Sequence, residues 1–371
     1  MAGAYIPLSS EDVVLSTDSV TSAMWSDNSP TLLNYFTSSA QVASAVAPYY
    51  YTVYQTASTE TTPIKAEIQF DIAYCDAEGS GSIDLNPLVT GTSPTRINYG
   101  QYRNLVLGDE NASFIFGNYS SSYFYVLNLE RARYKQNILP GTWTLELSAS
   151  ATNTDVKLTD DSLVNPVTSF TDAGRVYNII SGSAGVVTNG GIADSAHDAS
   201  GWTLTKGSYG WMLPDVNLLI LNGAALDGVV GDGGIDLTTL RGQALSTNTD
   251  NNPLLVFNAL NLGGGNWGQG GTAAGNGLGT GFTLNSQENL SSDFIFCRAR
   301  NNQINYSSNP SFISSSTGAI LFDSFITNPT TYITTVGLYN DSQELLATAK
   351  LSRPLEKDFT KELLVRVKLD F

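Results

Sequence analysis

Polar and apolar residues alternate with a period of two in several parts of this chain, which is typical of a β-strand that covers a core with one face. The pattern runs through Glu67–Tyr74 (EIQFDIAY), where we expect the other face to meet water, and it returns at the C-terminus, where Val365, Val367 and Leu369 alternate with charged residues. The 34 glycines and the frequent Ser, Thr and Asn also favour strands joined by turns, since these residues are costly inside helices. The sequence therefore predicts a mostly β fold with a minor α+β character: several domains of antiparallel, sandwich-like sheets, one or two short helices and long Gly-rich loops.

Two short helices are expected. Ser29 and Pro30 stand ahead of apolar residues at helical spacing and predict a helix near 30–46, because serine caps a helix and proline suits its first turn. A second helix is expected over 101–107, ending at Gly108 as a C-cap.

The strand patterns suggest three regions. The first, 1–150, is predicted to be a β domain with the helix near 30–46. The second, 151–290, is predicted to be a loop-rich, acidic, Gly/Asn-rich β domain or insertion with short apolar runs at 218–221 and 254–257. The third, 291–371, is predicted to be a β domain that ends in a strand. Besides Glu67–Tyr74, strands are expected at Tyr49–Tyr54, Ser113–Phe116, Tyr123–Leu129, Trp143–Ala149, Phe294–Phe296, Tyr332–Tyr339, Leu345–Leu351 and Leu364–Phe371, with a hairpin turn at Asn340–Gln343.

The charge of the chain disfavours nucleic acid as a partner. Eighteen Lys and Arg against 34 Asp and Glu give a net charge of -16, and an acidic protein repels phosphate backbones. No apolar stretch approaches the length of a membrane span, and the start of the chain lacks the basic and apolar regions of a secretory signal. We therefore expect a soluble protein that is made in a cytoplasm and does not insert into a membrane.

Enzyme motifs are weak throughout. His197 is the single histidine, and its neighbours in Asp194–Asp198 form a loop of a kind that seldom holds a catalytic geometry. Cys75 and Cys297 are far apart in sequence and are expected to be buried thiols rather than a redox pair or zinc ligands. A glycosidase needs only two facing carboxylates, so counting the acids leaves that class open.

Three loops hold residues that bind ions or nucleotides in other settings. Asp76–Asp84 resembles a calcium loop, but Pro87 occupies the place of its bidentate carboxylate, so a polar strand-to-strand loop is expected. Asp227, Asp232 and Asp236, in a Gly-rich stretch, could likewise bind a hard cation, but a polar loop is the expectation there too. Gly263–Gly281 formally contains GxGxxG, yet the residues after it cannot begin a helix, which predicts a mobile loop or a tight contact. No catalytic residue, cofactor or metal is therefore expected.

The C-terminal region carries a family resemblance. The stretches Cys297–Pro310 (CRARNNQINYSSNP), Tyr332–Asp341 (YITTVGLYND), Leu345–Pro354 (LLATAKLSRP) and Glu362–Phe371 (ELLVRVKLDF) resemble virion structural proteins of contractile-tailed phages, notably cyanophage-type myoviruses, of baseplate type. The stretch from Tyr99 to Leu147 is similar more loosely. The resemblance is strong over 295–371 and partial over 65–150, and the Gly-rich middle has no counterpart in it.

The resemblance implies a structural role. It implies a wedge or peripheral component of a tail baseplate that acts by oligomeric assembly in the virion, is made in the host cytoplasm, and is not an enzyme. The implied partners are other tail and baseplate proteins and copies of the same chain, with tail fibres as a further candidate. Three alternatives stay open: a tail-fibre or receptor-binding protein that contacts host surface glycan, a head or neck decoration protein, and a virion-associated glycan hydrolase.

Overall fold

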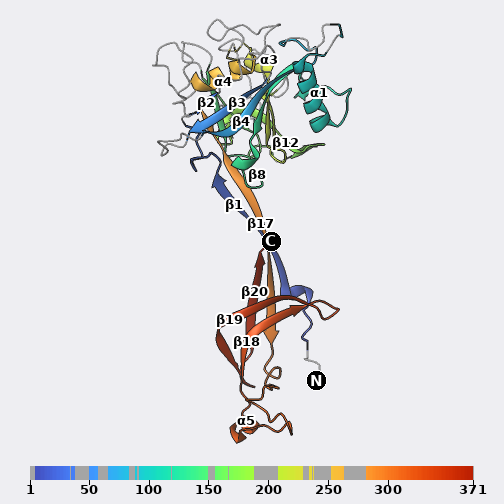
Figure 1. Ribbon diagram of the computed structural model, residues 1–371, viewed down its shortest axis with the longest axis vertical. Coiled ribbons are helices and arrows are strands. Elements are labelled where there is room, and N and C mark those ends of the chain that lie inside the picture. The colour runs from blue at the N-terminus through green and yellow to red at the C-terminus, as the bar shows by residue number, and fades with distance from the viewer. Residues whose placement is uncertain are drawn as a thin grey trace. The chain divides into compact units, whose positions relative to one another are not determined.

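The computed structural model is mostly β, as predicted, and forms two compact units (Figure 1). Unit 1 consists of Met1–Ser19 and Asn289–Phe371, and unit 2 is Val20–Glu288. The residues that the structure describes are 5–33, 35–37, 50–56, 66–82, 88–89, 92–117, 119–148, 155–165, 167–187, 208–228, 234–235, 237, 252–262 and 281–370.

Unit 2 is built on a large sheet in which twelve strands fall within the described residues, and all their assigned pairings are antiparallel. In spatial order the strands are β16 (Phe282–Thr283), β9 (Thr144–Ser148), β10 (Asp155–Asp160), β12 (Gly174–Ser183), β14 (Gly210–Leu213), β15 (Leu218–Asn222), β7 (Tyr123–Leu129), β4 (Ala66–Asp76), β3 (Tyr50–Thr56) and β2 (Tyr35–Thr37), with β11 (Ser169–Thr171) and β13 (Val186–Val187) paired to β12. The remaining elements are α1 (Pro94–Leu107), α3 (Gly223–Leu226), α4 (Asn252–Leu262), η3 (Arg131–Arg133), β8 (Asn137–Ile138) and the ribbon of β5 (Ile115–Phe116) with β6 (Tyr119–Ser120).

The central strands of this sheet are covered on both faces. Tyr74 and Cys75 are neighbours on β4, yet they belong to different hydrophobic clusters because successive side chains of a strand point to opposite faces. The cluster of Cys75 includes Tyr99 of α1, and the cluster of Tyr74 includes Phe257 of α4. The prediction that Glu67–Tyr74 has one face in water is therefore wrong for its second half, which helices cover on both sides.

The sheet also runs across the expected domain boundary near residue 150. Leu158 of β10 pairs with Leu145 of β9, and Leu219 of β15 pairs with Leu127 of β7. Strands from 1–150 and from 151–290 therefore share one sheet and one core. The two compact units differ in this respect from the three predicted regions, whereas the predicted region 291–371 corresponds closely to the C-terminal part of unit 1.

The helix predicted near 30–46 is wrong where the structure describes it. Tyr35–Thr37 is strand β2, Tyr35 pairs with Gln55 of β3, and the N–H of Leu32 donates to the carbonyl of Phe282 at 2.8 Å. The apolar side chains at 32 and 35 are fully buried by these long-range pairings, and tertiary packing of this kind overrides local helical spacing. Residues 38–49 lie outside the described part of the chain.

Two helices differ from the prediction in extent or type. α1 ends at Leu107 with Gly108 as its C-cap, as predicted, but begins at Pro94, several residues earlier than expected. The apolar run 254–257 lies within helix α4, although its region was expected to be β. A short, wholly apolar run suits a buried helix and a buried strand equally, so periodicity cannot separate the two.

Unit 1 contains a three-stranded sheet and a ribbon. The sheet has β17 (Asn285–Ala299) between β1 (Val13–Ala23) and β20 (Leu363–Asp370), and the ribbon pairs β18 (Thr331–Tyr339) with β19 (Leu345–Lys357). The strands and the hairpin turn predicted in this part of the chain are confirmed. β1 and β17 continue past the unit boundary into unit 2, where β17 pairs with β8. The short helices η1 (Ser10–Asp12) and α5 (Asp323–Thr327) complete unit 1.

The core of unit 1 is small. Its buried cluster joins Ile295 of β17, Leu338 of β18 and Val367 of β20, so the ribbon packs on the sheet. The partly buried residues that pack around these three are Cys297, Val336, Ala347, Ala349, Val365 and Leu369. This core is thin for a unit of roughly 100 residues.

Candidate functional site

The loop that resembles a calcium site is closed by its own first carboxylate. Asp76 ends β4, and its Oδ1 accepts the backbone N–H groups of Glu78 and Ser80, each at 2.9 Å. Burial raises the pKa of Asp76, and these hydrogen bonds act against that shift. Within the described residues, which here stop at Ser82, no group of three or more His, Cys, Asp or Glu side chains could hold a metal ion. The next helix or strand within the described residues is α1, and residues 83–87 and 90–91 between them lie outside the described part of the chain.

Asp227 is directed into unit 2 instead of into solvent. Its carboxylate accepts a hydrogen bond from the Tyr123 hydroxyl, beside the packed rings of Tyr74 and Tyr125. Within the described part of the chain, the buried hydroxyls of Tyr74 and Tyr125 have no hydrogen-bond partner, and burial raises the pKa of both far above that of a free tyrosine. A phenol in this state keeps its proton at neutral pH. Asp232 and Asp236 lie outside the described residues.

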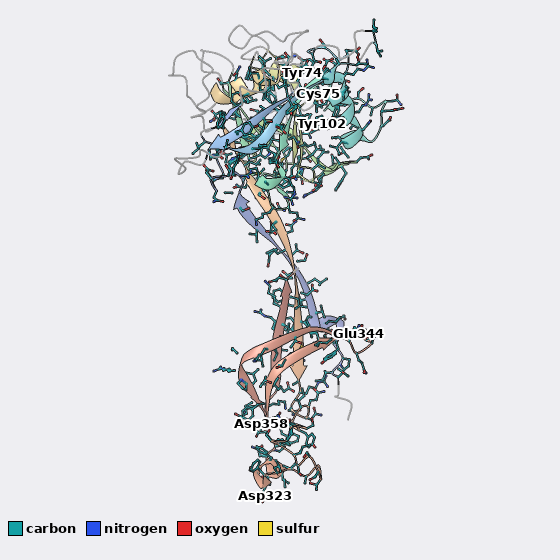
Figure 2. The ribbon with its side chains drawn as sticks, in the orientation of Figure 1. Tyr74, Cys75, Tyr102, Asp323, Glu344 and Asp358 are labelled. Carbon is teal, nitrogen blue, oxygen red and sulfur yellow. The ribbon has the colours of Figure 1, made fainter. Side chains whose placement is uncertain are left out.

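Of the other residues singled out from the sequence, some lie outside the described part of the chain and the two cysteines lie inside it. Asp194–Asp198, with His197, lies outside the described residues, as does Gly263–Gly281 except for its last residue. Cys75 is fully buried, and burial raises the pKa of its thiol well above the usual value. Cys297 is half-buried, and both thiols are free (Figure 2 labels Cys75). The expectation of buried thiols is therefore confirmed for Cys75 and only partly for Cys297.

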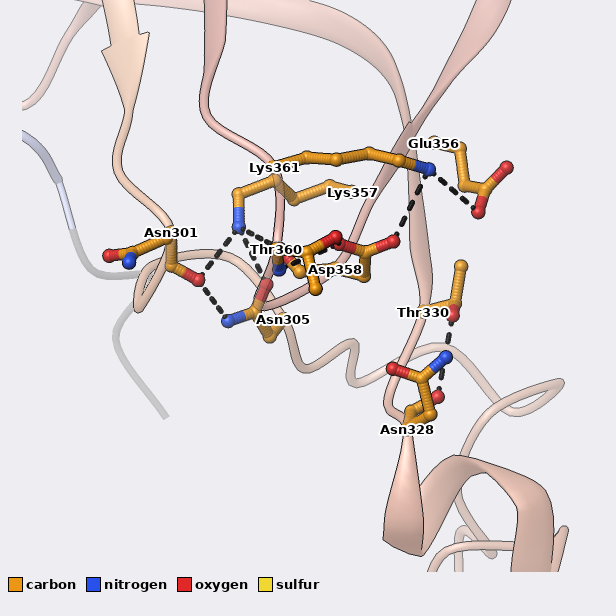
Figure 3. A network of polar contacts seen from close by, with 9 residues as sticks. All are labelled: Asn301, Asn305, Asn328, Thr330, Glu356, Lys357, Asp358, Thr360 and Lys361. Atoms are coloured by element: carbon orange, nitrogen blue, oxygen red, sulfur yellow. Dashed lines mark hydrogen bonds and ion pairs between the residues drawn. The ribbon is translucent and has the colours of Figure 1, made fainter.

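A buried lysine organises the base of the ribbon in unit 1 (Figure 3). Lys357 ends β19, is fully shielded from solvent, and donates to the carbonyl oxygens of Asn301 (3.0 Å) and Asp358 (2.8 Å) and to Oδ1 of Asn305 (2.7 Å). An ammonium group has three protons, so every donor is used. Burial lowers the pKa of Lys357, whereas the nearby Asp358 and Glu362 act in the opposite direction. The lysine therefore ties the loop after β17 to the end of β19.

Asp358 extends this network toward the surface. Its Oδ1 accepts the hydroxyl of Thr360 at 2.6 Å and the N–H of the same residue at 2.8 Å, and its Oδ2 lies 3.2 Å from Nζ of Lys361. The hydrogen bond from the Thr360 hydroxyl is the main cause that lowers the pKa of Asp358 to about 2. All these contacts are made within unit 1, which indicates that they anchor the loop after β17.

That loop ends in an aromatic cluster. Phe312 is buried and stacks on Phe325 of α5 with ring centroids 5.0 Å apart, while Phe322 and Tyr306 meet the pair edge to face. Phe322 and Ile326 are more than half exposed. Asp323 is the single charged residue in 304–330. We call this segment, 304–330, the aromatic loop; it presents large apolar side chains with almost no charge around them.

Exposed apolar side chains concentrate in unit 1. Among the described residues, 17 of the 29 exposed large hydrophobic side chains belong to this unit, although it holds little more than a quarter of the chain. They are Tyr5, Ile6, Leu8, Val13, Val14, Leu15, Ile304, Tyr306, Leu321, Phe322, Ile326, Tyr332, Tyr339, Leu345, Leu346, Phe359 and Leu364. For its size, unit 1 therefore exposes more large apolar side chains than unit 2 does within the described residues.

Reasoning from the sequence alone missed these features. In the sequence Lys357 is one charged residue in a polar stretch, and only its burial in the folded chain distinguishes it. The residues of β1 were not predicted as a strand, although Val13, Val14, Thr17 and Val20 supply the β-branched enrichment that could have identified it. Among the described residues, unit 1 combines loops anchored by buried polar contacts with strands that have an unpaired edge.

Comparisons with family models, with curated proteins and with solved structures find no match to this chain. Within the described residues, no helix is long and apolar enough to cross a membrane.

Proposed function

We propose that this chain is a structural component of a phage contractile-tail baseplate, a wedge or peripheral baseplate protein, that acts by oligomeric assembly and not by catalysis. The observation that carries the proposal is the concentration of exposed apolar side chains in unit 1. The strong part of the family resemblance, 295–371, falls in the same unit.

The physical argument rests on the thin core of unit 1. Six hydrophobic residues are buried among its described residues, namely Ile295, Ala299, Phe312, Ile313, Leu338 and Val367. Covering apolar surface contributes about 25 cal/mol per Å². Unit 1 alone leaves many of its large apolar side chains exposed, so it gains this stabilisation only when other subunits cover them. That behaviour fits a particle component better than a free enzyme.

The location of the protein in the particle tests the proposal. Purified phage particles are separated into heads, tails and tail tips, and the chain is quantified in each fraction by mass spectrometry against the sheath and major capsid subunits. We expect recovery with tail tips at a low, constant copy number. Recovery with heads would favour a decoration protein, and absence from particles would overturn the proposal.

Substitutions in the aromatic loop test whether this segment contributes to incorporation into particles. Replacing Phe322 and Ile326 by serine removes two exposed apolar side chains and leaves the Phe312–Phe325 stack in place. We expect lower incorporation into particles with unchanged solubility and fold. The matched control replaces Leu163 and Phe170, exposed residues of unit 2, by serine and should leave incorporation unchanged. Equal incorporation of both variants would exclude the aromatic loop from the contact.

A further inference from the structure

The sheet of unit 1 has two open edges. β17 lies in the middle, and β1 and β20 each pair with it on one side; in the described part of the chain neither has a strand partner on its other side. β17 and β20 are joined from Ser292↔Asp370 to Ala299↔Leu363, so the β20 edge runs over the whole strand. Each open edge presents backbone N–H and C=O groups that can pair with a further strand.

The β1 edge has few of the features that normally protect an edge strand, and Asp18 is its one charged residue. β1 is eleven residues long and contains neither lysine nor proline. Val13, Val14 and Leu15 are exposed in succession, and Leu15 is 76% exposed. A long, apolar and unprotected edge associates readily with another strand. Its natural state is therefore a paired one.

The two edges carry opposite charge. The N-terminal part of unit 1, residues 1–19, has three acidic residues and no basic one, and Asp18 lies within β1. On β20 the exposed Arg366 and Lys368 lie over the ring of Phe294, at 5.3 Å and 5.8 Å from its centroid, which holds both cations on one face of the sheet. The acid of this strand, Asp370, is already engaged by Ser292 and Lys368. Lys368 is engaged by the same ion pair, so by residue count β20 carries two basic residues and one acidic one, whereas β1 carries one acidic residue and no basic one.

These complementary edges belong to the same chain, which identifies a second copy as the occupant. Unit 1 has 11 acidic and 8 basic residues, against 23 and 10 in unit 2, so repulsion between copies is weakest where unit 1 meets unit 1. A contact between two different surfaces of one chain joins copies head to tail, and such a contact closes into a ring when the rotation allows.

We propose that the β1 edge of one copy pairs with the β20 edge of the next, so that copies of this chain join head to tail through unit 1. The inference rests on the proposed function, because it specifies how the oligomeric assembly is made. It names the partner as a second copy and the contact as a continued sheet.

Charge reversal at each edge of the full-length chain tests the proposal. One variant, L15K/D18K, makes the β1 edge basic, and the other, R366E/K368E, makes the β20 edge acidic; all four side chains are exposed. We expect wild type to be oligomeric by analytical ultracentrifugation and to dissociate as salt is raised. Each variant alone should associate at least on the order of a hundredfold more weakly, because like charges then meet at the contact.

Mixing the two variants is the decisive measurement. A basic β1 edge then faces an acidic β20 edge, and the native edges left on each variant also match, so the equimolar mixture should regain the wild-type oligomer. Matched controls place the same kinds of substitution away from the edges: L163K/D172K in unit 2 and K350E/R353E on β19, all at exposed positions. Circular dichroism checks that every variant is folded, and both controls should associate as wild type does.

Two results would overturn the proposal. A wild-type chain that stays monomeric at its highest soluble concentration has no such contact. An R366E/K368E variant that associates normally while L15K/D18K does not would indicate that β1 pairs with itself. Either result leaves the baseplate role standing if the chain is still recovered with tail tips, whereas an oligomer absent from particles would refute that role and keep the head-to-tail contact.

Discussion

Individual polar residues hold segments of unit 1 together where its small apolar core does not. Lys357 shows this best, because a fully buried ammonium is stable only when each of its protons finds an acceptor. Its three acceptors belong to Asn301, Asn305 and Asp358. The anchor of the aromatic loop is therefore a set of hydrogen bonds around one charge.

Removing this charge should loosen unit 1. Lys357→Met removes the donor from Oδ1 of Asn305 and from the Asp358 carbonyl, both in buried residues, at a cost of about 1–3 kcal/mol for each unsatisfied group. The Asn301 carbonyl keeps a donor, the side-chain amide of Asn305. We expect faster backbone hydrogen exchange in residues 300–330 by mass spectrometry. Lys350→Met, on the same strand but exposed, is the control and should leave the exchange unchanged. Equal effects of the two substitutions would contradict the anchoring role.

The stability of unit 1 should fall in acid because of Asp358. Its pKa in the folded protein is about 2, below the ordinary 3.8, so its contribution is fully present above about pH 4 and is lost as the pH falls through 2. Urea unfolding followed by the methyl NMR signal of Val367 should show this loss in wild type. Asp358→Asn removes the titrating group, and the difference between the two proteins should therefore shrink from pH 5 to about pH 2.

The C-terminal end of helix α1 is determined by the backbone conformation of its cap residue and not by side-chain contacts. Gly108 caps it with φ of 64°, and its N–H donates to the carbonyl of Asn104 at 3.2 Å. A Cβ at this position would also collide with the carboxylate of Asp172. Gly100, in the middle of the same helix, has open space around it and an ordinary helical conformation.

The two glycines should respond in opposite directions to the same substitution. Gly100→Ala should stabilise unit 2 by about 0.5–1 kcal/mol, because alanine loses less entropy in a helix than glycine. Gly108→Ala should destabilise it by at least about 1 kcal/mol, since the left-handed conformation is strained for alanine. Denaturant unfolding followed by tryptophan fluorescence measures both. Stabilisation by both substitutions would contradict the capping role of Gly108.

At the scale of the whole molecule, the two units are built on different principles. Unit 2 buries large apolar clusters on both faces of one sheet, whereas unit 1 buries few residues and exposes many. Unit 2 is also one continuous segment, Val20–Glu288, while unit 1 joins both ends of the chain. The core of unit 2 is therefore complete without the other unit.

We accordingly expect residues 20–288, expressed alone, to fold as a β-rich monomer. Its far-ultraviolet circular dichroism should show strands, its tryptophan fluorescence should report buried indoles such as Trp25 and Trp143, and ultracentrifugation should give one copy at every concentration. Association of this segment as strong as that of the full chain would place the contact between copies in unit 2 and not in unit 1.

The sequence by itself determined the mostly β class, the C-terminal hairpin, the strands predicted at Tyr123–Leu129 and Leu364–Phe371, and the end of α1 at Gly108. These features follow from local causes: the period of two, turn residues, and a backbone conformation that suits glycine. The baseplate role stays a prediction that the resemblance and the exposed surface of unit 1 support.

Only the tertiary structure decided the features that depend on distant neighbours. The residues around Tyr35 form a strand because β3 and the Phe282 segment pair with them, and 254–257 is helical because α4 covers one face of the large sheet. β1 joins β17 across more than 260 residues of chain, and Lys357 becomes an anchor only when loop 301–305 closes over it. Local patterns state which residues prefer an extended or helical backbone, but burial and strand partners arise from contacts between segments that no local pattern records.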